Sequence, residues 1–206
     1  MYGAFGLEPG TLQGKLLMNM DSEDFGELYV GCAGGMDANI EWKYQGVALP
    51  VGDIALKVNI TGLKGGHSGL EINLGRANAN KLLFRFLREA VSQYEARLAK
   101  VEGGNMRNAI PREAYAIITV PAEAREDIEK LVEEYRDLFN EEYKVTENPI
   151  IFTCEEVEAP EMLIPEEIQD DLINAVTACP NGVFRMIPAI PDTVETSMNL
   201  SIVEAN

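Results

Sequence analysis

Two amphipathic segments separated by strand-like runs constrain the fold of this chain more than any other feature. In residues 77–99 and again in residues 124–143, apolar side chains recur at the three- and four-residue spacing of one helical face. Alternating or apolar runs that favour strands surround these segments, at residues 54–61, 94–101, 114–121 and 149–154. The predicted order is strand, helix, strand, strand, helix, strand.

This order is typical of a ferredoxin-like two-layer sandwich, in which an antiparallel sheet carries both helices on one face. We therefore expect an α+β fold with the pattern βαββαβ. After Pro160 a weaker repetition begins, with a helix predicted from Pro165 to Ala178 and extended runs at residues 183–190 and 194–203. These features predict a partial second α/β unit.

The charge balance excludes several classes of partner. The chain has 206 residues with 17 basic and 34 acidic side chains, which gives a formal net charge of −17. That charge opposes nonspecific binding to nucleic acid or to anionic lipid. No apolar run approaches the roughly 20 residues that a membrane-spanning helix needs, and no leader pattern is present. We expect a soluble, cytoplasmic protein without nucleic-acid or membrane partners.

The single histidine, His67, lies in the glycine-rich loop Thr61-Gly-Leu-Lys-Gly-Gly-His-Ser-Gly69. One histidine cannot build a histidine-rich metal centre. Glycines on both sides let the backbone adopt positive φ and let a bound molecule approach closely. His67 is therefore the first candidate for a functional side chain.

Asp21 lies in an acidic cluster that follows an apolar run, Asn19-Met-Asp-Ser-Glu-Asp-Phe-Gly-Glu27. Carboxylates at the end of a strand can bind hard cations, but they also form solvated turns. Spacing alone favours the charged turn.

Five motifs, in one order along the chain, resemble the aminoacyl-histidine dipeptidases of the M20 metallopeptidase family. They are Gly3-Ala-Phe-Gly-Leu7, Asn19-Met-Asp-Ser-Glu23, Tyr29-Val-Gly-Cys-Ala-Gly-Gly35, Gly65-Gly-His-Ser-Gly69 and Asn105-Met-Arg-Asn-Ala-Ile-Pro111. The resemblance implies a catalytic domain with two divalent metal ions (zinc, or manganese or cobalt) and an inserted lid domain. It also implies a homodimer that hydrolyses Xaa-His and other dipeptides.

The resemblance also implies roles for individual residues. Asp21 matches a metal-ligating aspartate, and His67 matches a lid histidine that stabilises the substrate carbonyl or the oxyanion. Asn108, Asn105 and Arg107 are candidates for substrate binding, although Asn105 could serve the turn alone and Arg107 could form a local salt bridge.

Most of the family's metal ligands and its general base have no counterpart here. We therefore expect a catalytically inactive fragment with no tightly bound metal. Residues 1–50 are expected to be a remnant of the catalytic domain and its connection to the lid, residues 51–159 the first, ferredoxin-like half of the lid, and residues 160–206 its truncated second half. A noncatalytic self-associating module remains the alternative.

Overall fold

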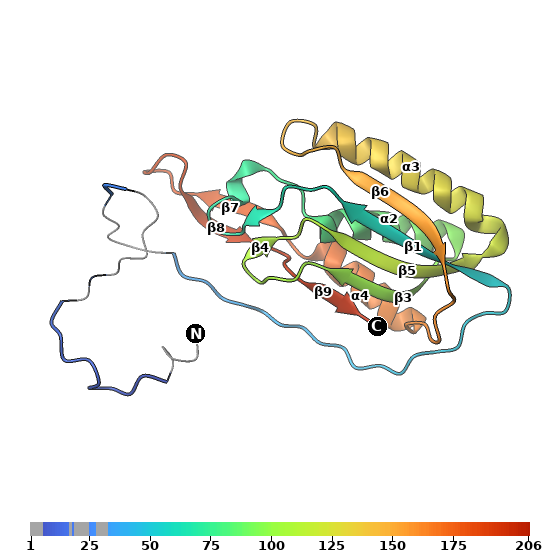
Figure 1. Ribbon diagram of the computed structural model, residues 1–206, viewed down its shortest axis with the longest axis horizontal. Helices are drawn as coiled ribbons and strands as arrows, with labels where there is room; N and C mark the ends of the chain where they lie inside the picture. Colours follow the sequence, from blue (N-terminus) through green and yellow to red (C-terminus); the bar gives the residue numbers. More distant parts are fainter. Residues whose placement is uncertain (1–5, 17, 19–24, 28–32) are drawn as a thin grey trace. The chain divides into compact units, whose positions relative to one another are not determined.

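The computed structural model describes residues 6–16, 18, 25–27 and 33–206 (Figure 1). The chain divides into two compact units, Met1–Asn39 and Ile40–Asn206. The described residues of the first unit contain no helix or strand. Every element described below belongs to the second unit. No helix of the described residues is long and apolar enough to cross a membrane.

A five-stranded antiparallel sheet organises the second unit. Its order is β6-β1-β5-β3-β9, with β6 and β9 at opposite edges (Figure 1). The strands are β1 (Asp53–Thr61), β3 (Arg97–Gly103), β5 (Ala114–Pro121), β6 (Ile151–Val157) and β9 (Val203–Ala205). Within the described residues the sheet therefore has two edge strands, of unequal length.

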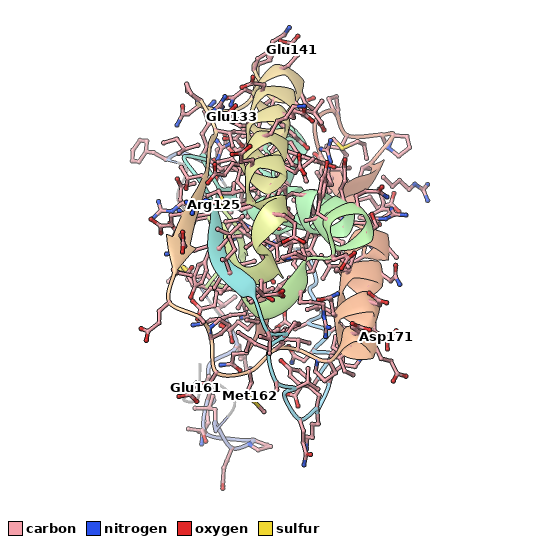
Figure 2. All side chains as sticks on the ribbon, turned by 90° about the vertical axis from the view of Figure 1, so that its right-hand side faces the viewer. Arg125, Glu133, Glu141, Glu161, Met162 and Asp171 are labelled. Atoms are coloured by element: carbon pink, nitrogen blue, oxygen red, sulfur yellow. The ribbon has the colours of Figure 1, made fainter. Side chains whose placement is uncertain are left out.

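Three helices pack against the sheet: α2 (Ala79–Tyr94), α3 (Arg125–Glu142) and α4 (Glu166–Ala178). Helix α2 contacts β1, β5 and β3, α3 contacts β6, and α4 contacts β3. Helix α2 lies between α3 and α4 (Figure 2). The helices thus form one layer over the sheet.

Alternation along the strands builds the core between these layers. Leu56, Val58 and Ile60 of β1 are fully buried, whereas Lys57 and Asn59 between them remain partly exposed. Burial of each such aliphatic side chain stabilises the fold by roughly 1.5–3 kcal/mol. The large aromatic and aliphatic members of the same core include Phe84, Phe86, Phe139, Phe152, Leu82, Leu83, Leu87, Leu98, Ile118 and Ile128.

The structure confirms the α+β class and the predicted order of elements, as β1-α2-β3-β5-α3-β6. The predicted extension of the first helix to Ala99 is wrong, because α2 ends at Tyr94. Glu95 adopts a left-handed conformation with φ 55°, and its backbone N–H donates to the carbonyl of Ala90, which ends the helix. The chain then enters β3.

Two small sheets and two short 3-10 helices complete the described elements. In one sheet β2 (Gly66–His67) pairs with β4 (Ala109–Ile110), and in the other β7 (Gly182–Met186) pairs with β8 (Val194–Met198). Strand β4 lies at the same end of the large sheet as β7 and β8 (Figure 1). The 3-10 helices are η1 (Ile72–Leu74) and η2 (Ala122–Ala124).

The segment after Pro160 shares the same core. Leu172, Ile173 and Val176 of α4 are buried in it, and so is Val203 of β9. The helix predicted between Pro165 and Ala178 is confirmed as α4. The division of the lid at residue 160 remains a prediction.

Candidate functional site

The β2–β4 pair brings the histidine loop and the asparagine loop together. Gly66 lies opposite Ile110 and His67 opposite Ala109. The backbone N–H of Ser68 donates to the carbonyl oxygen of Asn108 over 2.9 Å. Two motifs that are distant in sequence therefore form one surface, which the sequence reasoning named residue by residue but could not assemble.

The predicted site residues take different places on this surface. His67, Asn105, Arg107 and Asn108 are all exposed. Of these four, only Asn105 lines the neighbouring open cleft, which has a volume of about 750 Å³. Asp21 lies outside the described residues.

The cleft beside the loops carries both acidic and basic groups, and its acidic residues are Glu102 and Glu113. Lys64 and Arg112 line it together with Asn105, and Tyr115 lies on its β5 side. The ammonium group of Lys100 lies 5.6 Å from the centre of the Tyr115 ring and 2.6 Å from a carboxylate oxygen of Glu102. Ammonium, guanidinium and amide donors of this kind can bind carboxylate or carbonyl oxygens.

The imidazole of His67 is held by its own loop. Its Nδ1 atom accepts hydrogen bonds from the backbone N–H groups of Gly69, over 3.0 Å, and Leu70, over 3.1 Å. The backbone N–H of Glu71 in turn donates to the carbonyl oxygen of His67 over 3.0 Å. Nε2 is the ring nitrogen left to face a ligand.

An ion pair supports this loop. The backbone N–H of His67 donates to Oε2 of Glu71 over 2.8 Å, and Oε1 of Glu71 lies 2.9 Å from Nη2 of Arg76. The Nη1 group of Arg76 donates to the carbonyl oxygen of Gly65. The His67 backbone N–H, followed by the charge of Arg76, holds the pKa of the Glu71 carboxyl below its usual value, although desolvation opposes this shift.

Gly66 makes room for that ion pair. A Cβ atom at this position would lie 2.5 Å from Nη1 of Arg76 and 2.7 Å from Oε2 of Glu71, and the backbone φ is +145°. The backbone conformation therefore favours glycine, and a Cβ atom would also displace the ends of the Arg76 and Glu71 side chains. The sequence analysis assigned the loop glycines to positive φ and to the approach of a ligand, and positive φ is confirmed at Gly65 and Gly66. It missed the room that Gly66 leaves for the ion pair.

A buried carboxylate joins the two ends of the loop. Glu147 is only 8% exposed, and its oxygens accept the backbone N–H groups of Lys64, over 2.7 Å, and Ala77, over 2.9 Å. Sequence reasoning did not identify Glu147 or Arg76. In the sequence each of them is one charged residue among many. The groups that they bind come close to them only when the chain folds.

The described residues do not fit a two-metal centre. Among them, no group of three or more histidine, cysteine, aspartate or glutamate side chains is placed to hold a metal ion. No reaction step can therefore be assigned through a metal from these residues.

Comparisons with known proteins find similar chains. A family profile described as "Peptidase dimerisation domain" of the M20 type matches residues 58–147. The cytosol non-specific dipeptidase of Escherichia coli (strain K12) is 40% identical over 203 residues, which is 98% of this chain and 42% of that protein.

A solved structure gives the same result in three dimensions. The crystal structure of the aminoacylhistidine dipeptidase from Vibrio alginolyticus superposes with a TM-score of 0.83 at 41% identity, covering 98% of this chain and 41% of that one. The chain therefore spans less than half the length of either relative.

Proposed function

We propose that this chain, which matches an M20 peptidase dimerisation profile over residues 58–147 and is similar to aminoacyl-histidine dipeptidases, forms the lid and dimerisation module of a metal-dependent dipeptidase. The observation that carries the proposal is the similarity to a dipeptidase over 98% of the chain, in both sequence and fold. The substrates would be Xaa-His and other dipeptides, and the location the cytosol. The acidic surface, with a net charge of −17, gives no basis for nucleic-acid or membrane partners.

His67 is proposed to donate a hydrogen bond from Nε2 to the substrate carbonyl or to the oxyanion that forms from it. Its exposure on a glycine-rich loop and the engagement of its other ring nitrogen support this role. A donor placed where negative charge develops contributes about 2.7–4 kcal/mol to transition-state stabilisation. Asn108, which is beside the histidine loop, and Asn105 and Arg107 on the same turn are proposed to bind the substrate's carbonyl or carboxylate oxygens.

The complete enzyme is proposed to bind two divalent metal ions, zinc or else manganese or cobalt, with Asp21 as one ligand. When bound, such ions would supply a water of lowered pKa and would polarise the peptide carbonyl. Since the described residues supply no ligand set, we expect the chain alone to lack hydrolytic activity.

The proposed partner is a second copy of the same protein. Strand β6 is an edge of the sheet with seven residues, compared with three in β9 at the other edge, and its Ile151, Thr153 and Glu155 are exposed. An edge strand presents unpaired backbone groups that can bind the same strand of another copy. A self-associating module without any catalytic context is the alternative function, and it makes the same prediction for the dimer.

Hydrolysis separates the two functions. The test measures cleavage of a Xaa-His dipeptide with added zinc, manganese or cobalt by this chain, by a full-length version, and by full-length His67→Ala and Gln93→Ala variants. Gln93 is exposed on α2, away from the loops, and serves as the control. We expect activity only in the full-length forms, with kcat lowered at least about 100-fold by His67→Ala.

Each other outcome has a definite meaning. Activity in the short chain would show that these residues hold a complete catalytic site after all. Equal activity of the two variants would remove His67 from the mechanism. An inactive full-length protein would favour the noncatalytic module.

A further inference from the structure

The geometry points to a positioning role for Glu71 and Arg76: we propose that their ion pair holds the histidine loop so that His67 is fixed as the neutral Nε2–H tautomer, a hydrogen-bond donor and not a proton acceptor. This inference rests on the proposed function only where it assigns a substrate oxygen as the acceptor. The tautomer itself is a property of this chain and is measured without substrate.

The two ring nitrogens of His67 have different surroundings. In neutral imidazole one nitrogen carries a proton and the other accepts, and the hydrogen bonds made by one decide the state of the other. Nδ1 of His67 faces two backbone N–H donors, from Gly69 and Leu70. A proton on Nδ1 would point at these donors and break both bonds. The proton of the neutral ring therefore belongs on Nε2.

A closed turn keeps these donors in place. Gly69 and Leu70 lie between His67 and Glu71, whose backbone N–H donates to the His67 carbonyl. The Glu71 carboxylate returns to the backbone N–H of His67, so both ends of the turn are tied to each other. The turn that aligns the two donors with Nδ1 is thus closed by two contacts of Glu71, its backbone N–H and its carboxylate.

Arg76 anchors that carboxylate. It binds Oε1 of Glu71 with Nη2 and the carbonyl oxygen of Gly65 with Nη1. Its planar guanidinium therefore joins the end of the turn to the residue before Gly66. Arg76 is the more buried partner, with 20% of its side chain exposed against 36% for Glu71. Charge-assisted bonds at such a partly buried position are stronger than ordinary hydrogen bonds.

Little space surrounds the ring on its Nδ1 side. A Cβ atom on Gly69 would lie 3.2 Å from Cε1 and 3.3 Å from Nδ1 of His67. The ring therefore packs directly against the backbone that donates to it. Rotation of the ring to present Nδ1 outward would forfeit both hydrogen bonds and this contact.

His67 and the ion pair therefore have different roles. His67 can donate to an oxygen that gains negative charge, but it cannot take a proton through Nδ1 while the loop is intact. Glu71 and Arg76 do not touch the substrate in this arrangement. They act through His67, by removing its freedom to change tautomer or rotate.

The test uses the fact that His67 is the only histidine of the chain. ¹⁵N NMR of the ring at about pH 8.5, where an ordinary imidazole is neutral, reads its tautomer without overlap. We expect two well-separated resonances, a non-protonated Nδ1 and a protonated Nε2. Resonances at positions averaged between tautomers, or a protonated Nδ1, would overturn the proposal from the wild-type spectrum alone.

A variant tests the positioning role. Glu71→Gln removes the charge that binds Arg76, and we expect averaged ring resonances together with amide exchange at Gly69 and Leu70 that is faster by about tenfold. The control Glu142→Gln removes an ion pair with Arg85 on the helical side. Identical ring spectra in the two variants would overturn the role of Glu71. If Glu71→Gln does not fold, Arg76→Lys is measured in its place. Lysine keeps the positive charge but lacks the planar guanidinium that binds both Glu71 and the Gly65 carbonyl. Averaged ring resonances would support the positioning role, and a spectrum identical to that of Glu142→Gln would overturn it.

The two proposals fail separately. A fixed Nε2–H tautomer in a protein whose full-length form does not hydrolyse dipeptides refutes the function and leaves the loop mechanism standing. An averaged ring in an enzyme that depends on His67 refutes the loop mechanism alone.

Discussion

The side-chain amide of Asn199 donates to the backbone carbonyl of Ala109 over 2.7 Å. Ala109 lies in β4 directly opposite His67 of β2. Asn199 therefore supports the backbone beneath the candidate site. The C-terminal part of the chain is bound to the site by this contact.

Asn199→Ala is expected to lower the free energy of unfolding by about 1–3 kcal/mol, because the Ala109 carbonyl loses its donor in a partly buried position. Amide exchange at Ser68, which is bonded to the same asparagine loop, should accelerate as well. Urea unfolding and hydrogen exchange measure the two effects. Thr196→Ala, at an exposed position of β8, is the control; equal effects of both variants would contradict the support by Asn199.

Glu147→Gln should destabilise the protein by about 1–3 kcal/mol. Both carboxylate oxygens accept backbone N–H groups, from Lys64 and Ala77, and the amide of glutamine can replace only one of them. Thermal and urea unfolding measure the change. Glu133→Gln on the exposed side of α3, labelled in Figure 2, provides the matched substitution. A destabilisation no larger than that of Glu133→Gln would show that the buried contacts contribute nothing.

Lys81→Met should loosen the end of α4. The Lys81 ammonium group donates to the carbonyl oxygens of Val176, Thr177 and Cys179, at distances of 2.7–2.9 Å. These carbonyls would otherwise lack intrahelical partners, so we expect a loss of about 1–3 kcal/mol and faster exchange in the last turn of α4. Lys130→Met, whose side chain is 74% exposed, should be near neutral. Unchanged exchange in α4 would contradict the capping role.

Acidification should release the histidine loop. The pKa of Glu71 is lower in the folded protein than in the unfolded chain, mainly because the His67 backbone N–H binds its charged form. The ionised Glu71 carboxylate therefore stabilises the folded loop fully above the pKa of glutamate in the unfolded chain, about 4.3. This stabilisation is lost as the pH falls through the lower pKa of Glu71 in the folded protein. The amide proton of His67, followed by NMR between about pH 6 and pH 3, should shift with a midpoint below that of a free glutamate.

The Glu102 carboxyl also has a lowered pKa, mainly because of its hydrogen bond with the Lys100 side chain. The resonances of the core strands, followed in the same titration, separate global unfolding from the local transition at His67. The Glu71→Gln variant should show no such transition at His67. A midpoint at or above the ordinary glutamate value would refute the hydrogen bond as the cause.

Gly66→Ala should be more harmful than Gly52→Ala by about 2 kcal/mol. Both glycines have positive φ, +145° and +99°, so both substitutions strain the backbone. Only at Gly66 does the new Cβ atom also meet Arg76 and Glu71, whereas nothing lies within 4 Å at Gly52. Denaturant unfolding of the two variants isolates the steric part. Equal losses would mean that the ion pair moves aside without cost.

Elements whose cause is local could be predicted from the sequence. The periodic apolar residues of α2 and α3 and the alternation along β1 and β5 indicate which side of each segment is buried, and this information lies within one or two turns or a few strand positions. The α+β class follows from the order of these segments. The glycines around His67 likewise indicate a loop of unusual conformation, because only glycine adopts positive φ without strain.

The contacts that complete the site depend on tertiary packing. The end of α2 at Tyr94 depends on the left-handed Glu95, although the apolar pattern continues beyond it. Glu147 and Asn199 act on loops that are far from them in the chain. Their partners are fixed only when the sheet and helices pack. A single charged or amide side chain does not indicate in the sequence which distant backbone group it will bind.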